Sequence, residues 1–160
     1  MKKIILMFLA IVSLSCNSHA QKEQPKKEFE IKKSEAEWKA ELSPQEFQVL
    51  RKEGTERAFS SPLLRVSEAG TFVCAACGNP LYKTENKFNS GTGWPSFDRA
   101  ISDVNVTYRE GTSGGFSALE VLCGKCGGHL GHVFNDGPDE TTGIRHCVNG
   151  IALNFIPEKK

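Results

Sequence analysis

A chain of 160 residues is long enough for one ordinary domain with appendages and too short for two. It carries 20 Lys and Arg side chains against 19 Asp and Glu, so its formal net charge is +1. A balance this near to neutrality provides no basic surface for nucleic acid or for an anionic membrane. We therefore expect neither as an electrostatic partner.

The first twenty residues are predicted to be an export signal. Two lysines, at positions 2 and 3, precede an apolar run over 4–14 that has the length of a signal core and is too short to span a bilayer. The residues around Cys16 resemble the box recognised by the lipoprotein signal peptidase, so we expect a lipid anchor on Cys16, with cleavage after Ala20 as the alternative. Either cut predicts an exported protein of the periplasm or cell envelope, and any attachment to the membrane would come only from a lipid on Cys16.

Residues 21–34 are expected to form a solvated tether. The segment is polar and charged, holds one proline and offers little to bury. Ordered structure should therefore begin close to Ser34, and residues 35–160 are expected to form one domain and to remain monomeric.

A helix is predicted near the start of this domain. Ser43 is a suitable N-cap, Pro44 takes the first helical position, and Glu46 completes a capping box. The helix should run to about Glu53, with Gly54 ending it.

Helical periodicity is lost beyond this helix, and short apolar runs separated by Gly- and Asp-rich turns follow. Four of these runs are predicted to be strands, at residues 71–74, 104–109, 118–122 and 144–155. The expected fold is mainly β and antiparallel, with a short helical flank on its N-terminal side.

Four cysteines form two Cys-x-x-Cys pairs, Cys74 with Cys77 and Cys123 with Cys126, and glycine follows each pair. Glycine allows the tight turn in which backbone amides point at thiolate sulfur. Two such turns supply the four soft ligands of a tetrahedral Zn²⁺ site, so the pairs predict a structural zinc that ties distant strands together. A disulfide in each pair, a redox-active pair and an iron site are the alternatives.

Cys147 has no partner once these four cysteines are used, and a lone thiol in an exported protein is either buried and inert or reactive. Alternate residues of an extended strand share a face, so Arg145, Cys147 and Asn149 should point the same way. A guanidinium beside a thiol favours the nucleophilic thiolate, and the Asn149 amide is suited to bind a polar substrate atom. These neighbours favour a reactive cysteine.

A glycine-rich loop holds two of the four histidines, His129 and His132, directly after the second cysteine pair. Attachment to a rigid metal site would fix both imidazoles for proton transfer or for binding an oxyanion. Asp136 is expected to orient one ring, or to begin the turn that the following Gly-Pro predicts. Zinc ligation by the two histidines is the alternative and would need a third ligand.

A second loop, residues 89–97, holds Trp94 among Gly and Pro residues. Most tryptophans belong to protein cores, but an aromatic side chain in such a loop is also suited to the wall of an apolar pocket. The loop is therefore a candidate wall of the substrate site.

Together these features make the chain similar to the B-type peptide methionine sulfoxide reductases from about Glu37 to Pro157. Five motifs in the same order carry the resemblance: GTERAF at 54–59, FVCAACGNPL at 72–81, KFNSGTGWPSF at 87–97, LCGKCGGHLGHVFNDGP at 122–138 and RHCVNGIALNFIP at 145–157. The resemblance implies two antiparallel β-sheets, zinc on the two Cys-x-x-Cys pairs, and reduction of methionine R-sulfoxide in oxidised proteins or peptides.

The resemblance also implies a role for each candidate residue. Cys147 would attack the sulfoxide sulfur and become a sulfenic acid, and Arg145 would favour its thiolate. A polar set would bind and protonate the sulfoxide oxygen: His129, His132 and Asn149, supported by Asp136. Two aromatic side chains would form the pocket for the terminal methyl group: Trp94 and Phe134.

The chain departs from the family pattern at Thr92, where many members carry a resolving cysteine. We therefore expect an external thiol, such as a thioredoxin-like protein, to reduce the sulfenic acid directly. His146 stands where many members have an aromatic residue, and strand alternation should turn it away from Cys147. A zinc-ribbon-like binding module without activity, and a cysteine peroxidase or disulfide oxidoreductase, are the competing functions.

Overall fold

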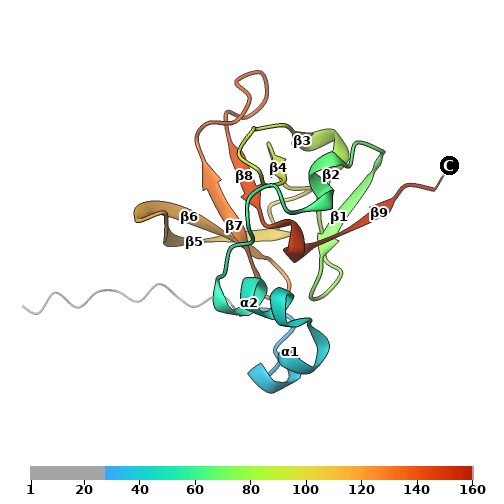
Figure 1. The fold of residues 1–160 in the computed structure, drawn as a ribbon, viewed down its shortest axis with the longest axis vertical. Coiled ribbons are helices and arrows are strands. Elements are labelled where there is room, and N and C mark those ends of the chain that lie inside the picture. The colour runs from blue at the N-terminus through green and yellow to red at the C-terminus, as the bar shows by residue number, and fades with distance from the viewer. Residues whose placement is uncertain (1–27, 160) are drawn as a thin grey trace, which may run out of the picture.

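The computed structural model describes residues 28–159, so the predicted export signal, Cys16 and residues 21–27 of the predicted tether lie outside the described residues. Helices α1 (Glu35–Glu41) and α2 (Pro44–Lys52) lie side by side at one end of the molecule, below two β-sheets in Figure 1. Within residues 28–159, no helix has the length and apolar character needed to cross a membrane.

The last part of the predicted tether contacts the domain. The backbone N–H of Ile31 donates to the Lys125 carbonyl at 3.1 Å, and the Ile31 side chain packs against the core. The ring of Phe29 covers Gly127 so closely that a Cβ at this glycine would lie 2.5 Å from it. Contacts with the domain therefore begin before Ser34.

Helix α2 begins as predicted. The Ser43 hydroxyl accepts a hydrogen bond from the Glu46 amide at 3.3 Å, the Glu46 carboxylate accepts from the Ser43 amide at 2.8 Å, and Pro44 takes the first helical position. The helix ends differently, because Glu53 rather than Gly54 adopts the left-handed conformation, with φ of 57°. Gly54 is still required there, since a Cβ would lie 2.9 Å from the Gln48 carbonyl oxygen.

Helix α1 was not predicted as a separate element. Its N-cap is Ser34, which forms a second capping box with Glu37. Only Trp38 is buried among its seven residues, and the Arg51 guanidinium from α2 stacks on this ring at 3.7 Å. One buried side chain produces no helical periodicity, so the capping box was the only signal for this helix.

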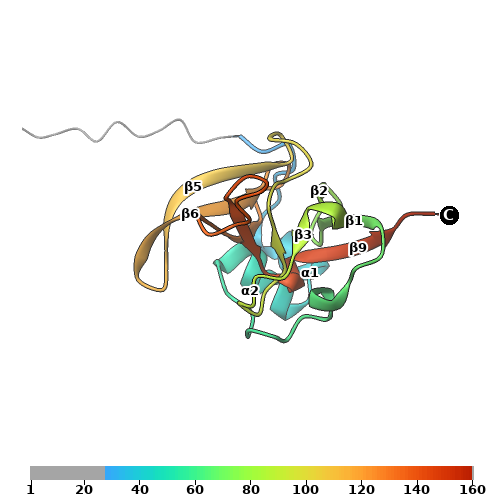
Figure 2. The same cartoon turned by 90° about the horizontal axis from the view of Figure 1, so that it is seen from above.

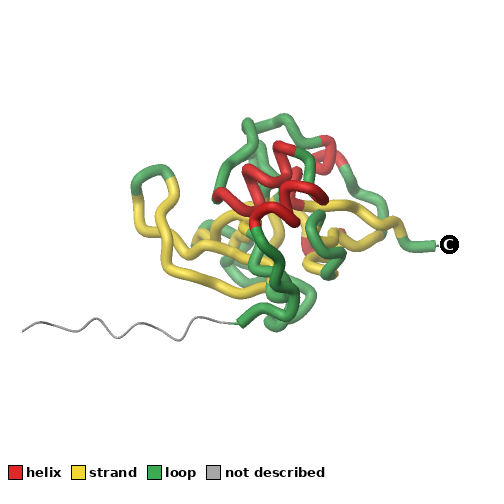
Figure 3. Tube along the Cα trace, turned by 90° about the horizontal axis from the view of Figure 1, so that it is seen from below, coloured by secondary structure: helices red, strands yellow, loops and turns green. Residues whose placement is uncertain are grey.

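Two antiparallel sheets follow the helices, which confirms the expected fold class. The smaller sheet has the order β2–β1–β9, with bounds Pro80–Lys83, Gly70–Cys74 and Leu153–Pro157. The larger sheet has the order β3–β4–β8–β7–β6–β5, with bounds Lys87–Phe88, Ser96–Phe97, Arg145–Val148, His129–Phe134, Phe116–Cys123 and Val106–Ser113. The β5–β6 hairpin projects beyond the rest of the molecule in all three views (Figures 1, 2 and 3).

The predicted strand at 144–155 is wrong as a single element. It divides into β8 in the larger sheet, a short 3-10 helix η3 (Gly150–Ala152), and β9 in the smaller sheet. The apolar pattern continues through the turn, so periodicity does not reveal the break. Two further 3-10 turns are present: η1 (Pro62–Arg65) lies between α2 and β1, and η2 (Thr84–Asn86) lies between β2 and β3.

A cluster of buried aromatic side chains joins the two sheets. Tyr82 of β2 stacks on Phe97 of β4 with ring centroids 4.3 Å apart, and Phe72 of β1 meets Phe97 edge to face at 5.0 Å. All three side chains are fully buried. Large aromatic surfaces of this kind contribute much of a core's stability, so this cluster holds the two sheets together.

Candidate active site

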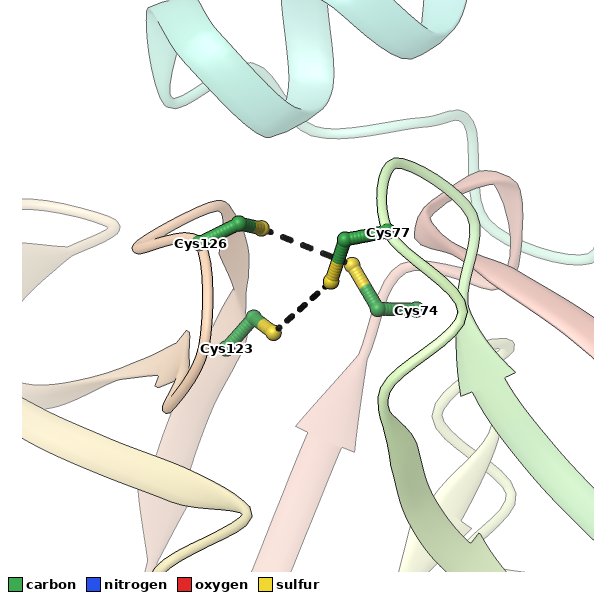
Figure 4. A group of neighbouring side chains, drawn as sticks. All are labelled: Cys74, Cys77, Cys123 and Cys126. Atoms are coloured by element: carbon green, nitrogen blue, oxygen red, sulfur yellow. Dashed lines mark hydrogen bonds between the residues drawn. The ribbon is translucent and has the colours of Figure 1, made fainter. Parts of the chain in front are cut away.

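The four paired cysteines come together between the two sheets (Figure 4). Cys74 ends β1 and Cys77 lies in the turn before β2, while Cys123 ends β6 and Cys126 lies in the turn before β7. All four sulfurs lie within 4.8 Å of one another. A tetrahedral ion with metal–sulfur bonds of about 2.3 Å places its sulfurs about 3.8 Å apart, so this arrangement fits a bound metal.

The sulfur distances argue against disulfides. Neither Cys-x-x-Cys pair is joined by a disulfide, and between the pairs the sulfurs of Cys74 and Cys126 (3.8 Å) and of Cys77 and Cys123 (3.6 Å) are too far apart for a bond of about 2.0 Å. All five cysteines among the described residues are free thiols. The glycine after each pair has positive φ, as the predicted tight turns require.

One face of the larger sheet collects the catalytic candidates. The strand register places five residues opposite one another in a single row: Arg109 of β5, Glu120 of β6, His132 of β7, Cys147 of β8 and Ser96 of β4. Residues opposite each other in antiparallel strands point to the same face. The sheet topology therefore brings His132 beside Cys147.

A bulge in β7 turns His129 toward the same face. Two residues three apart in a regular strand point to opposite faces. The pairing of β6 with β7 shifts at Leu130, which becomes an extra residue between His129 and Gly131. As a result the His129 and His132 rings meet edge to face, with centroids 5.4 Å apart.

Glu120 is a site residue that was not predicted. One carboxylate oxygen lies 2.7 Å from His129 Nδ1, and the other accepts a hydrogen bond from Arg109 Nε at 2.7 Å. Burial raises the pKa of Glu120, but the hydrogen bonds from His129 and Arg109 outweigh it and hold the pKa below its ordinary value. Glu120 is therefore ionised although it is only 3% exposed.

The ionised carboxylate fixes the tautomer of His129. A carboxylate without a proton only accepts hydrogen bonds, so Nδ1 of His129 must carry a proton. The Nε2 atom is buried and has no hydrogen-bond partner among the described residues. In the neutral ring this atom is an acceptor. A signal for Glu120 existed in the sequence, since it is an acidic residue inside the predicted strand 118–122.

Asp136 does not support a histidine, and that prediction was wrong. Its two carboxylate oxygens accept hydrogen bonds from Nε and Nη2 of Arg145, both at 2.8 Å. The guanidinium also stacks over the Phe134 ring at 4.5 Å. The planar fork of arginine matches both carboxylate oxygens at once, which explains why Asp136 pairs with Arg145 instead.

Cys147 lies at a small pocket of about 170 Å³. The wall includes residues from loop 89–97, from the end of the β5–β6 hairpin, and from β7 and β8. The complete lining is Thr55, Thr92, Trp94, Ser113, Gly131, His132, Phe134, Arg145, Cys147 and Asn149. Of the predicted site residues outside the metal cluster, His129 and Asp136 do not line this pocket.

The Cys147 thiol is not strongly acidic in this structure. Burial raises its pKa above the ordinary value, while the positive charge of Arg145 and the hydroxyl of Thr92 oppose the rise. Arg145 thus acts in the expected direction without outweighing burial. The pKa of His132 is lowered by burial and by its neighbour His129, so its ring is neutral near pH 7 and can accept a proton.

Glu56 positions two walls of the pocket. Its backbone amide donates to Asn149 Oδ1 at 3.0 Å, and its carbonyl accepts from Trp94 Nε1 at 3.2 Å. The Glu56 carboxylate accepts from two backbone amides of η3. Asn149 Nδ2 also donates to the Leu130 carbonyl at 3.0 Å, so the amide expected to bind substrate is held by the backbone as well.

The chain is similar to a set of known proteins. The SelR domain matches residues 42–157. The peptide methionine sulfoxide reductase MsrB of Leptospira interrogans is 48% identical over 130 residues, covering 81% of this chain and 98% of that protein. Proteins of the same name from Methanosarcina barkeri (50% over 130 residues, 81% and 91% covered) and Chromohalobacter salexigens (46% over 127 residues, 79% and 96% covered) are also similar. The chain therefore belongs to the SelR domain family, together with these MsrB proteins.

Proposed function

We propose that this protein reduces the R epimer of methionine sulfoxide in oxidised peptides and proteins, with Cys147 as the nucleophile. The observation that carries the proposal is the row in which the Cys147 thiol stands opposite His132, at a pocket walled by Trp94 and Phe134. The family membership and the names of its relatives support the same activity.

The reaction transfers one oxygen atom. The Cys147 sulfur attacks the substrate sulfur, the sulfur–oxygen bond of the sulfoxide breaks, and the oxygen ends on Cys147 as a sulfenic acid. Methionine is released, its sulfur reduced by two electrons while Cys147 is oxidised by two. The thiol proton leaves Cys147 and ends on the transferred oxygen, so the step needs no other proton source in total.

The strand register and the pocket lining support His132 as the residue that carries that proton. It lies opposite Cys147 in the register, lines the pocket and is neutral near pH 7. His129 lies behind it and is oriented by the ionised Glu120. We assign His132 to proton transfer with the substrate, and we assign His129 and Glu120 to positioning the His132 ring.

The pocket size suits the end of a methionine sulfoxide side chain. Trp94 and Phe134 supply apolar surface for the terminal methyl group, and Asn149 and Arg145 supply polar groups on the same wall. Because Asp136 and Glu56 hold these polar groups in place, substrate binding does not have to order them.

The metal is proposed to be zinc, because four thiolates at tetrahedral spacing are its usual structural ligand set. Such a closed site has no open position for substrate, so the ion would stabilise the fold. Cys74, Cys77, Cys123 and Cys126 would hold it.

Regeneration is proposed to use an external dithiol such as a thioredoxin-like protein. Thr92, not a cysteine, lines the pocket beside Cys147. Two reductant thiols would convert the sulfenic acid to the Cys147 thiol and water while forming one disulfide on the reductant.

Export and lipid anchoring at Cys16 are also proposed, with a location in the periplasm or cell envelope. The basic residues and apolar run of segment 1–20 support this proposal. The mass of the N-terminal peptide of protein purified from membranes distinguishes a lipidated Cys16 from cleavage after Ala20.

The activity is tested by turnover with stereochemically pure methionine sulfoxides and dithiothreitol as the reductant. The wild type should reduce the R epimer and leave the S epimer, and Cys147→Ser should reduce neither. Reduction of both epimers, or an active Cys147→Ser variant, contradicts the proposal.

A further inference from the structure

The pocket at Cys147 is too small to hold a peptide. Its volume of about 170 Å³ is below the roughly 300–1,000 Å³ of ordinary small-molecule sites. It accommodates the end of one side chain. If the substrate is a peptide, the residues on either side of the oxidised methionine must lie on the surface around the pocket.

A larger groove of about 640 Å³ lies on the other side of Trp94. Trp94 lines both the groove and the pocket, so the two are neighbours that share this side chain as a wall. Apolar side chains, among them Pro62, Leu64 and Phe88, form part of the groove wall. A peptide held by its sulfoxide side chain in the pocket can therefore continue along the groove.

Phe59 lines this groove with an exposed side chain and an uncommon backbone conformation. Its side chain is 71% exposed, and its backbone is left-handed, with φ of 64°, which is rare for a bulky residue. The conformation is fixed, because the Phe59 amide donates to the Gly93 carbonyl at 2.7 Å and a Cβ at Gly93 would lie 2.9 Å from Phe59. A strained residue that holds an aromatic ring in solvent beside the groove supports a role in contacting a ligand there.

The charged side chains that line the groove are all positive. Its lining includes Arg65 and Lys87, and the described residues that line it include no Asp or Glu. Lys87 is held in place by a hydrogen bond from Nζ to the Leu64 carbonyl at 2.9 Å. The groove is therefore complementary to an acidic peptide segment.

We propose that this groove binds the part of a peptide substrate that flanks the oxidised methionine, and that it favours acidic residues there. The inference rests on the proposed reduction of methionine sulfoxide and adds a sequence preference to it. Arg65 and Lys87 would attract the acidic side chains, and Phe59 would pack against the peptide.

The experiment compares short peptides that contain methionine R-sulfoxide next to a pair of glutamates or a pair of lysines, placed before or after it. At low ionic strength the wild type should show kcat/KM about three- to tenfold higher for the glutamate peptide in at least one placement, as expected for two exposed ion pairs. Added salt should reduce this ratio.

Arg65→Gln and Lys87→Gln test the assignment, and glutamine at position 87 keeps a donor for the Leu64 carbonyl. Each should reduce the glutamate-to-lysine ratio, and the double variant should bring it close to one. The ratio cancels any general loss of turnover. Lys83→Gln is the matched control, because this partly exposed lysine of β2 pairs with Glu158 and does not line the groove.

The outcomes separate the two proposals. A wild type that reduces neither peptide contradicts the proposed activity itself. A wild type that reduces both peptides equally in both placements, or a ratio that survives the double variant, overturns the groove assignment and leaves the activity intact.

Discussion

The Glu120 carboxylate connects the charged surface of the sheet to the buried histidine. It accepts hydrogen bonds from Arg109 and His129, and Arg109 also pairs with Glu53 at the end of α2. Because Arg109 is about half exposed, its charge can be held there at little cost, while Glu120 and His129 are almost fully buried. The buried carboxylate therefore has two effects. It holds the His129 ring in place, and it decides which nitrogen of that ring carries the proton.

Glu120→Gln separates these effects. A glutamine amide can donate to His129 Nδ1, which would move the proton of the neutral ring to Nε2. We expect kcat to fall by about 10–100-fold, by analogy with metal-bound histidines that lose their hydrogen-bonded carboxylate. KM should change little because Glu120 does not line the pocket. The measurements are steady-state kinetics and the ¹⁵N shifts of the His129 ring.

Glu53→Gln is the control for this prediction, because it removes only the outer pairing of Arg109. It should leave kcat and the His129 tautomer as in the wild type. An unchanged tautomer and an unchanged kcat in Glu120→Gln would show that Glu120 has no role in positioning His129.

The bulge in β7 is the element on which the site geometry depends most. It brings His129 and His132 to one face, and it lies directly against β8. Gly131 permits this contact, since a Cβ there would lie 1.9 Å from the Cys147 carbonyl oxygen. The clash would be with backbone, which cannot move aside as a side-chain end can.

Gly131→Ala should therefore separate β7 from β8. We expect a loss of about 1–3 kcal/mol in the free energy of unfolding, as for other overpacked sites, and at least a tenfold loss of turnover. Denaturant unfolding and kinetics measure both. Gly111→Ala is the control, because its Cβ would make only ordinary contacts. If Gly131→Ala has the denaturant midpoint and the turnover of the wild type, the close approach of Gly131 to the Cys147 carbonyl is not needed for stability or activity.

Among the helices with a local capping signal, α2 was predicted and α1 was not, and the features that depend on distant partners were not predicted. The capping box of Ser43 identified α2, and alternation in β8 placed Arg145 and Cys147 at one pocket while turning His146 away. The bulge, the pairing of Asp136 and the role of Glu120 follow from which strands lie side by side. That information is not present in the periodicity of any one segment.

At the scale of the whole molecule, the cysteine cluster and the aromatic cluster both join the two sheets. Each cysteine pair closes a hairpin turn, β1–β2 in one sheet and β6–β7 in the other. Because β7 begins directly after this turn with His129, the metal site also fixes the start of the catalytic strand.

Metal removal should consequently unfold the domain. A structural zinc site contributes about 10–16 kcal/mol in small metal-dependent domains, which matches or exceeds the usual total stability of about 5–15 kcal/mol. We expect one zinc per chain by elemental analysis, and loss of near-ultraviolet circular dichroism after chelation or in Cys123→Ser. A metal-free protein that keeps its fold and activity would contradict this role.

Stability should also depend on pH through His146. Its ring is buried, lies 3.1 Å from the Tyr82 hydroxyl, and burial lowers its pKa to about 4. The unfolded chain binds a proton near pH 6.5 and the folded chain does not until about pH 4, so stability falls as pH drops through this window. The loss amounts to about 3 kcal/mol.

His146→Gln keeps a hydrogen-bond partner for Tyr82 and removes the titrating group. Urea unfolding of both proteins between pH 6.5 and 4.5 should show a steeper loss of stability in the wild type. Parallel pH dependence in the two proteins would mean that His146 is not held neutral by the fold.

The central claim is that Cys147 works as the single reactive cysteine. Its most direct test is one turnover of the fully reduced, metal-loaded protein with methionine R-sulfoxide and no reductant, followed by dimedone trapping and mass spectrometry. We expect one methionine per chain, a sulfenic acid adduct on Cys147 and no intramolecular disulfide. A disulfide between Cys147 and another cysteine, or one methionine formed by Cys147→Ser, would contradict it.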